Sequence, residues 1–385
     1  MGRSAPHIFL IVFYLFNSLL GADVIELSNI YKSDIIIPNS IKIKTDEIVI
    51  AAKSSIYVFN KSGELKQRIA SSDSLRIEGS LTIDKFQNKI VTKSIENGIW
   101  YLILIENETL KKVAPHHTVI SDIFFQKNGQ FIYVCGVHLT KYYEYLQKYD
   151  SNTYTPSEFE IEQFRSLFEN STAYSISLYD QNLALIDSID TYDIKGDQLK
   201  SYSNLTYKEM FDIDKENNIY VCHYDTNYRI MKYNVSGQLL YTITGHNTNF
   251  NSIKSPLSFN HVERLNRIRG SHSVFNSLKI LDDYIVLQFN DNPGSDWDGY
   301  IQSDPYWYYD IYDINGVLKN SGKNHFRIYT KDGENILYTL VIEKGMWPFT
   351  RSRYFLVPFT INDLLENKVT NEFISQKVIK FKLRP

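Results

Sequence analysis

Six aromatic and basic side chains in the C-terminal half of this 385-residue chain are of the types that bind ligands. They are Trp297, Tyr300, Trp307, Trp347, Arg351 and Arg353. Trp, Tyr and Arg are enriched where proteins recognise a partner, and flat aromatic faces also suit sugar rings. The alternative is that some of them pack between structural elements. We predict that the six residues line one concave ligand-binding patch.

The segment around the first of these tryptophans also carries oxygen donors, namely Asp291, Asp296 and Asp298 beside Asn and Gly residues. Ca²⁺ takes such ligands, but the spacing does not match an EF-hand loop, and Asx-Gly clusters more often form turns. We therefore expect neither a metal nor another cofactor, with Ca²⁺ as the alternative.

Catalytic signatures are missing from the sequence. It contains no Gly-x-Ser-x-Gly elbow, no His-Glu-x-x-His pair and no glycine-rich phosphate loop. The chain is therefore predicted not to be an enzyme.

The elements that position these residues are predicted by a repeat. Six segments each carry an alternating apolar strand, a polar turn and a β-rich strand, followed by a second pair of strands around a turn rich in Asn, Asp and Gly. The first strand of each unit has two apolar residues on one face: Ile41/Ile43, Leu81/Ile83, Ile123/Phe125, Phe211/Ile213, Leu278/Ile280 and Phe326/Ile328. The sixth turn, at Phe359–Leu364, is the weakest copy. The pattern predicts an all-β, six-bladed β-propeller of four-stranded antiparallel blades, with seven blades as the alternative.

We expect residues 23–385 to form a single propeller domain, because each blade buries its apolar faces only against its neighbours. The predicted blades span about 41–70, 79–114, 120–190, 208–245, 274–322 and 326–383. Val24–Ile37 and Phe373–Leu383 both alternate like strands, and either could complete the last blade.

Long insertions interrupt this pattern at four places: His138–Thr172, His246–Ser273, Asn290–Tyr306 and Glu343–Ser352. All four fall between strands two and three of a unit or between units, and these connections share one face of a propeller. The opposite face keeps tight turns. Function tends to reside in elaborated loops on a rigid frame, so we expect the binding face over blades 3–6, although long loops also collect on one side by drift.

The fourth unit carries a family resemblance. Its apolar strand, Asp/Asn turn, Ile219-Tyr220-Val221 and Arg229-Ile230 followed by Tyr233 and a Gly turn resemble the NHL-repeat propellers and the related six-bladed group of exported bacterial proteins. That resemblance implies a propeller whose members include ligand binders, protein binders, lactonases and lyases, so it selects no single function.

The alternative function is therefore a lactonase- or lyase-type enzyme with a metal in the central channel. Such a site needs carboxylate, Asn or His ligands that converge from several inner strands. The inner strands offer a set of mixed charge: Asp84, Asp122, Asp212, Asp214, Lys279 and Arg327. Because this is not a clean acidic ring, a non-catalytic binding module is the preferred prediction.

Residues 1–22 have the pattern of a signal peptide, with Arg3, an apolar run from Ile8 to Phe16, and small residues before Asp23. A short membrane anchor is the alternative. Cleavage would leave no stable membrane span and place the protein in the periplasm, at the cell surface or outside the cell.

The formal net charge of −3 argues against nucleic acid as a partner, because phosphate backbones need a basic footprint. The expected partner is instead a protein, peptide or carbohydrate ligand. Arginines near the insertions, including Arg351 and Arg353, would also suit a carboxylate or phosphate group.

Overall fold

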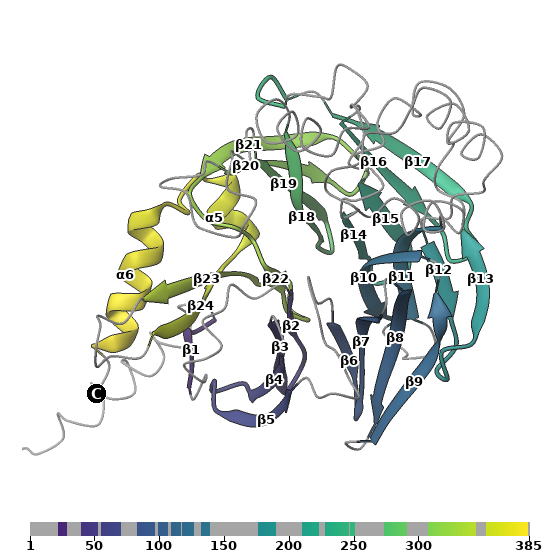
Figure 1. The fold of residues 1–385 in the computed structure, drawn as a ribbon. Helices are drawn as coiled ribbons and strands as arrows, with labels where there is room; N and C mark the ends of the chain where they lie inside the picture. Colours follow the sequence, from purple (N-terminus) through teal and green to yellow (C-terminus); the bar gives the residue numbers. More distant parts are fainter. Residues whose placement is uncertain are drawn as a thin grey trace, which may run out of the picture.

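The computed structural model describes residues 22–28, 40–52, 55–70, 83–96, 99–106, 109–116, 118–126, 132–138, 176–189, 210–222, 228–245, 247–250, 273–290, 307–343 and 352–383. Their strands are arranged around a central axis, with two helices at one side of the ring (Figure 1). The predicted signal peptide lies outside the described residues except for Ala22.

Three sheets follow one another in the first half of the chain. Sheet 1 comprises β2 (Ser40–Ile43), β3 (Glu47–Ala52), β4 (Ser55–Asn60) and β5 (Leu65–Ala70). Sheet 2 comprises β6 (Ile83–Phe86), β7 (Lys89–Glu96), β8 (Ile99–Glu106) and β9 (Thr109–His116). Sheet 3 comprises β10 (Thr118–Phe125), β11 (Ile132–His138), β12 (Ile176–Tyr179) and β13 (Leu185–Ile189).

Two further sheets continue the ring in the same order. Sheet 4 comprises β14 (Met210–Ile213), β15 (Ile219–Cys222), β16 (Arg229–Tyr233) and β17 (Leu239–Thr244). Sheet 5 comprises β18 (Val274–Ile280), β19 (Tyr284–Asn290), β20 (Trp307–Asp313) and β21 (Leu318–Asn324).

Sheet 6 joins the two ends of the chain. Its strands β22 (Thr330–Lys331), β23 (Leu337–Glu343) and β24 (Arg353–Phe359) are followed by β1 (Ile25–Leu27), which pairs antiparallel to β24 with Ile25 opposite Leu356. The predicted propeller of four-stranded antiparallel blades is confirmed. Of the two segments that could complete the last blade, the N-terminal one does so.

The turn chemistry explains the repeated outer hairpins. In sheet 4 the Asn234 side-chain oxygen accepts hydrogen bonds from the backbone N–H groups of Ser236 and Gln238, at 3.1 and 2.8 Å. Gly237 supplies the positive φ, +77°, that the turn requires. Asp313 accepts the corresponding bonds in sheet 5.

The C-terminal segment departs from the predicted pattern. Phe359–Leu364 is not a hairpin turn: Thr360 caps helix α5 (Ile361–Leu365), and its side chain forms a capping box with Asp363. Phe373–Leu383 is likewise not a strand, since Thr370 caps helix α6 (Asn371–Lys382). The apolar residues of this segment also fit the spacing of a helix. Ile374 and Val378, four residues apart and therefore on one helix face, are the buried residues of α6.

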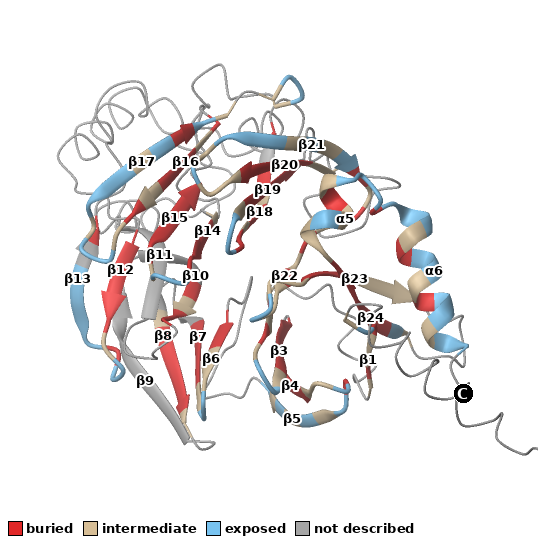
Figure 2. Cartoon of the chain, turned by 180° about the vertical axis from the view of Figure 1, so that it is seen from behind, coloured by how far each residue is buried: buried red, intermediate tan, exposed pale blue. Residues whose placement is uncertain are grey.

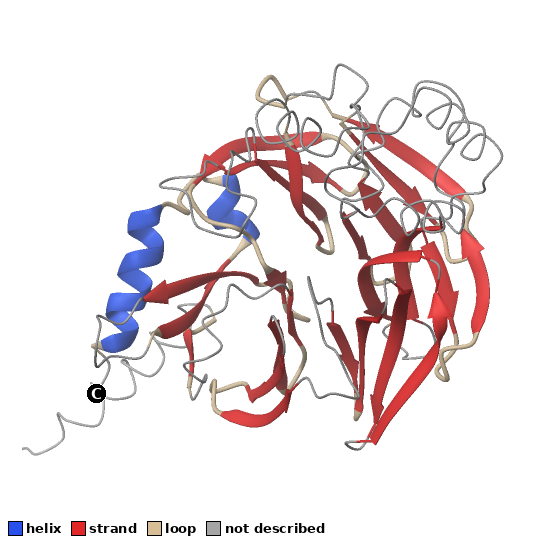
Figure 3. Cartoon of the chain, in the orientation of Figure 1, coloured by secondary structure: helices blue, strands red, loops and turns tan. Residues whose placement is uncertain are grey.

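Inner strands are buried and outermost strands exposed, as Figure 2 shows most clearly for β13 and β17. The predicted inward-facing residues are all buried, apart from Leu81, which lies outside the described residues. Phe326 and Ile328 are buried just before β22 rather than in a strand. Strands dominate the fold and the helices stand at one edge (Figure 3). In the described part of the chain, no helix combines the length and apolarity that a membrane span requires.

Candidate functional site

Two buried aspartates on innermost strands connect neighbouring sheets. Asp84 of β6 accepts a 2.6 Å hydrogen bond from the backbone N–H of Phe125 on β10, and its side chain is fully buried. The ammonium of Lys44, from sheet 1, forms a salt bridge with the same carboxylate. One carboxylate therefore contacts residues from two other sheets.

Asp212, on the innermost strand of sheet 4, makes the same kind of connection. Its Oδ2 accepts a 2.8 Å hydrogen bond from the backbone N–H of Ile280 on β18. Lys331, from sheet 6, places its Nζ 3.2 Å from that oxygen and also donates to the carbonyl of Ile280. Sheets 4, 5 and 6 thus meet at one ion pair.

The charge state of Asp212 follows from its surroundings. Burial by itself raises the pKa of this carboxyl, but the charges of Lys331, Lys279 and Lys42 and the Ile280 N–H outweigh burial and hold the pKa below its ordinary value. Asp212 is therefore an ionised carboxylate at neutral pH, although it is only 2 % exposed.

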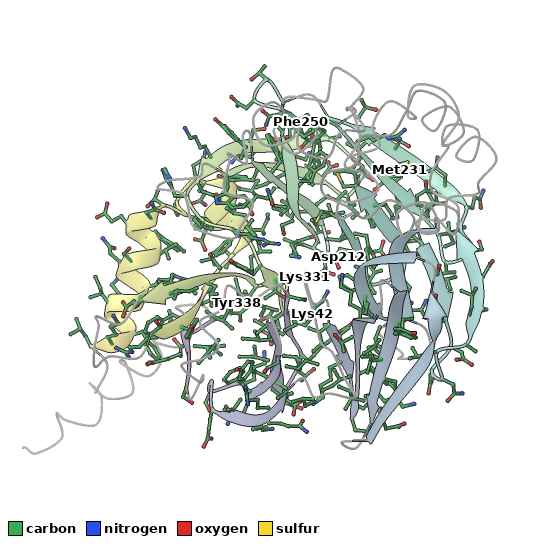
Figure 4. All side chains as sticks on the ribbon, in the orientation of Figure 1. Lys42, Asp212, Met231, Phe250, Lys331 and Tyr338 are labelled. Carbon is green, nitrogen blue, oxygen red and sulfur yellow. The ribbon has the colours of Figure 1, made fainter. Side chains whose placement is uncertain are left out.

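A cavity of about 730 Å³ opens beside this ion pair at the ring axis. Lys42, Asp212 and Lys331 lie close to one another at the centre of the ring (Figure 4). The lining comes from innermost strands of all six sheets and from the turns that follow several of them, for example at Thr45, Gln87 and Gly333. The cavity therefore lies on the side of the tight turns between first and second strands, opposite the face on which the sequence predicts the binding patch.

The lining carries more positive than negative side chains. Among the described residues it holds six lysines and four carboxylates: Lys42, Lys44, Lys66, Lys85, Lys279 and Lys331 against Asp46, Glu47, Asp212 and Asp332. The whole chain has a net charge of −3, so the cavity has the opposite sign to the protein. Walls of low dielectric concentrate such a field on a bound ion.

Part of the wall is apolar. Phe86, Phe124 and Phe125 contribute to the lining, and the ammonium of Lys42 lies 3.2 Å from the centroid of the Phe124 ring. A lysine in this position is oriented by a cation–π contact. The cavity can therefore hold an anionic group beside an aromatic surface.

Several of the residues weighed for a central metal site are engaged otherwise, whereas the side chain of Asp122 lies outside the described part of the structure. Asp84 and Asp212 bind lysines and backbone amides, and Asp214 accepts from the backbone N–H groups of Glu216 and Asn218 in a turn. Arg327 donates to the carbonyl of Asn276. The described residues include no group of three or more His, Cys, Asp and Glu placed to hold a metal ion. A lysine-rich lining also repels cations, so this donor set does not fit a metal.

The predicted loop patch is only partly visible. Trp297, Tyr300, Trp347 and Arg351 lie outside the described residues, as does the Asp291–Asp298 segment considered for Ca²⁺. Trp307 is half-buried at the start of β20, opposite Asn290 and Asn324. Grouping of the six residues in one patch therefore remains a prediction.

Arg353 has a role that the sequence did not indicate. Its guanidinium donates two 2.7 Å hydrogen bonds to the carboxylate of Glu26 on β1. The bond to Arg353 is the main reason why the pKa of Glu26 is lowered. Arg353 thus links the N-terminal strand to β24, the strand beside it in sheet 6.

The lysines of the cavity were missed in the sequence, apart from Lys279. A signal was present: Lys42 and Lys44 alternate with the inward-facing Ile41 and Ile43, and Lys279 lies between the apolar pair of sheet 5. A lysine on the first strand of a single unit indicates no binding site. Lysines on the first strands of several units indicate a shared site only once these strands are known to surround one axis.

Comparisons with known proteins identify no family for this chain: no family model matches it, and no curated protein is significantly similar.

Solved structures align with it along most of its length. Hydrazine synthase of Kuenenia stuttgartiensis is 11% identical with a TM-score of 0.49, covering 91% of this chain and 84% of that chain. A Bacteroides fragilis protein described as exported is 11% identical with a TM-score of 0.49, covering 89% and 96%. The WD40 domain of Neurospora crassa Pan2 is 9% identical with a TM-score of 0.46, covering 88% and 98%. Similarity at this level carries no inference about function.

Proposed function

We propose that this protein is a non-catalytic β-propeller binding module whose axial cavity holds an anionic group of its ligand. The observation that carries the proposal is the lining itself, in which lysines from sheets 1, 2, 5 and 6 converge on one space of about 730 Å³. Ammonium groups are mobile point charges that bind carboxylates and phosphates without needing a fixed geometry. The anionic group could belong to a peptide, a protein side chain or an acidic carbohydrate.

The finer parts of the proposal rest on the sequence. We propose six blades of the NHL-like type, supported by six four-stranded sheets among the described strands. Export to the periplasm, the cell surface or the medium is supported by the pattern of residues 1–22. The metal-dependent lactonase or lyase alternative is less favoured, because the lysines would oppose a divalent cation.

The loop patch is a second candidate surface for a macromolecular partner, supported by its composition of Trp, Tyr and Arg. A partner that binds there should bind more weakly to Trp347→Ala, with the melting temperature unchanged. Unchanged affinity for Trp347→Ala would place the partner elsewhere.

The cavity is tested with small anions at constant ionic strength. We expect phosphate, sulfate and succinate to raise the melting temperature of the wild-type protein relative to chloride. Lys42→Met keeps the aliphatic stem above Phe124 but removes the charge, and it should abolish most of this shift. The control Lys368→Met removes an exposed lysine between α5 and α6 and should retain the shift. Equal shifts in wild type and Lys42→Met would overturn the proposal.

A further inference from the structure

We propose that β17, the outermost strand of sheet 4, pairs with β17 of a second copy of this chain, antiparallel and across a two-fold axis at the middle of the strand. The two four-stranded sheets then join edge to edge into one continuous sheet. This surface lies on the rim of the ring, apart from the axial cavity, so the inference goes beyond the proposed function.

The outer edge of β17 is open among the described strands. β17 pairs with β16 alone and lies on the outside of the ring (Figure 1). Four of its six residues are exposed, namely Leu239, Leu240, Thr242 and Thr244. An edge strand presents N–H and C=O groups that can pair with another strand.

β17 also lacks the features that protect such an edge. Its sequence Leu-Leu-Tyr-Thr-Ile-Thr contains no charged residue and no proline. Charged side chains or proline on an edge strand discourage pairing with another chain. Each of the five other outermost strands carries charge: Glu26 in β1, Lys66 and Arg68 in β5, Lys111 and Lys112 in β9, Asp187 in β13, and Lys319 and Lys323 in β21.

The neutral edge is the reason to expect a second copy of the chain as the partner. Of the outermost described strands, only β17 can face its own copy without bringing like charges together. A single edge of this kind pairs with itself in a closed dimer, because the same surface serves both copies.

Exposed apolar side chains on the adjoining sheets extend this surface. The outer turn of each sheet packs on the outermost strand before it, since a Cβ on Gly237 would lie 3.0 Å from Ile189 and one on Gly316 would lie 2.8 Å from Ile243. The outer hairpins of sheets 3, 4 and 5 are therefore contiguous. Large apolar residues about half exposed flank β17 on both sides: Leu185, Ile186, Val317 and Leu318. An apolar patch of this kind typically marks a protein interface.

The ladder between β16 and β17 shows which groups face the open edge. Gly245 donates its N–H to the carbonyl of Tyr228 at 3.0 Å. Bonds to the partner alternate along an antiparallel strand, so Ile243 also bonds toward β16. The N–H and C=O groups of Thr242 and Thr244 consequently point away from β16.

A second β17 must match outward-facing residues with outward-facing residues. The two-fold axis therefore passes through a residue position, Tyr241, Thr242 or Ile243, and not between two residues. In each case the two Thr242 side chains lie on one face of the joined sheet, directly opposite or diagonally adjacent, within about 8 Å. A charge at this position should therefore reveal the pairing.

Analytical ultracentrifugation of the purified protein over a concentration series tests the proposal. We expect the wild type to form a dimer. Thr242→Lys and Thr242→Glu each bring like charges together across the axis and should weaken the dimer at least tenfold. An equimolar mixture of the two variants should restore it, because a lysine then meets a glutamate. The control Ser375→Lys adds the same charge at an exposed position of α6 and should dimerise like the wild type.

Hydrogen exchange gives a second readout that needs no variant. The outward N–H groups of Thr242 and Thr244 gain hydrogen bonds on pairing, so their exchange in the wild type should slow as the protein concentration rises. Exchange in β17 that is independent of concentration, while the protein dimerises, would place the interface elsewhere and overturn the proposal.

The other outcomes are equally decisive once circular dichroism has shown that each variant is folded. A wild type that stays monomeric throughout the series would overturn the proposal and leave this edge to an extended peptide or to another segment of the chain. Dimers that neither charge variant weakens would overturn it as well. So would a mixture of the two variants that stays monomeric, because the Thr242 side chains would then not be neighbours.

Discussion

At the scale of single residues, two inner strands each carry a buried aspartate that bonds to neighbouring sheets. Asp84 and Asp212 each accept a backbone N–H from the next sheet along the chain and each face a lysine from another sheet. A buried carboxylate is costly unless it is paired and hydrogen-bonded, so each aspartate requires all of its partners. Gln288 connects sheet 5 to the segment just before β22 without a charge, accepting from the N–H of Ile328 at 2.8 Å and donating to the carbonyl of Phe326 at 2.8 Å.

The lowered pKa of Asp212 predicts how its contribution to stability depends on pH. The folded protein holds this carboxyl at a pKa below the ordinary value of 3.8, so the folded state binds fewer protons than the unfolded chain near that pH. The contribution is present above pH 4 and is lost as the pH falls through the lower, folded-state value.

Urea unfolding of wild type and Asp212→Asn at each pH from 6 to 2 measures this contribution, because the comparison cancels the other carboxylates. We expect the free energy of unfolding of the wild type to fall relative to that of the variant on acidification below pH 4, because only the wild type must then protonate this carboxylate. A gap that stays constant across this range would contradict the assignment of Asp212 as an ionised, lysine-stabilised group.

At the scale of elements, the short N-terminal strand β1 is held by contacts on both of its sides. On one side it pairs with β24 and Glu26 binds Arg353. On the other side Gly63, in the outer turn of sheet 1, accepts hydrogen bonds from the backbone N–H and the hydroxyl of Ser28, at 2.8 and 3.1 Å. A three-residue strand by itself would be marginal, so these contacts are needed to keep it in sheet 6.

Gly63→Ala is expected to loosen this closure. Gly63 has a φ of +84°, and a Cβ at this position would lie 1.9 Å from the carbonyl oxygen of Glu26. The left-handed backbone and the clash with β1 together should lower the free energy of unfolding by about 2 kcal/mol or more. Denaturant unfolding measures the loss.

Gly333→Ala is the matched control, because a Cβ there meets nothing within 4 Å and its φ is not among the positive values. It should change stability by less than about 0.5 kcal/mol. If both substitutions cost the same, Gly63 would be an ordinary turn residue and β1 would not depend on it.

At the scale of the whole molecule, cores between adjacent sheets hold the ring together. One buried cluster joins sheets 5 and 6 with the two helices, through residues such as Ile311, Phe355, Leu364 and Val378. Another joins sheets 4 and 5. Since each sheet buries its faces against its neighbours, loss of one sheet exposes two others, and the propeller should unfold as a unit.

Limited proteolysis tests this picture of the whole chain. We expect the first cuts within Glu144–Asn170, which lies in the long insertion between β11 and β12, and later cuts in the paired strands of Met210–Gly245. Mass spectrometry of the earliest fragments locates the cleavage sites. Early cleavage within Met210–Gly245 would mean that sheet 4 opens independently of its neighbours.

The sequence alone determined the four-stranded antiparallel unit, the burial of pairs such as Ile41/Ile43 and Phe211/Ile213, and the turn chemistry at Asn234 and Asp313. These features depend on residues close together in the chain, where spacing and turn chemistry carry the information. The alternation over Phe373–Leu383 misled because a cap at Thr370 and a helical spacing outweighed it.

Only the tertiary structure decided which segment completes sheet 6, that Arg353 serves that closure, and that lysines from four sheets share one cavity with Asp212. Lys42 and Lys331 are separated by most of the chain, and no local pattern relates them. They line one cavity because the ring brings the first strand of every sheet to one axis. The site therefore depends on closure of the whole ring and is not contained in any single repeat.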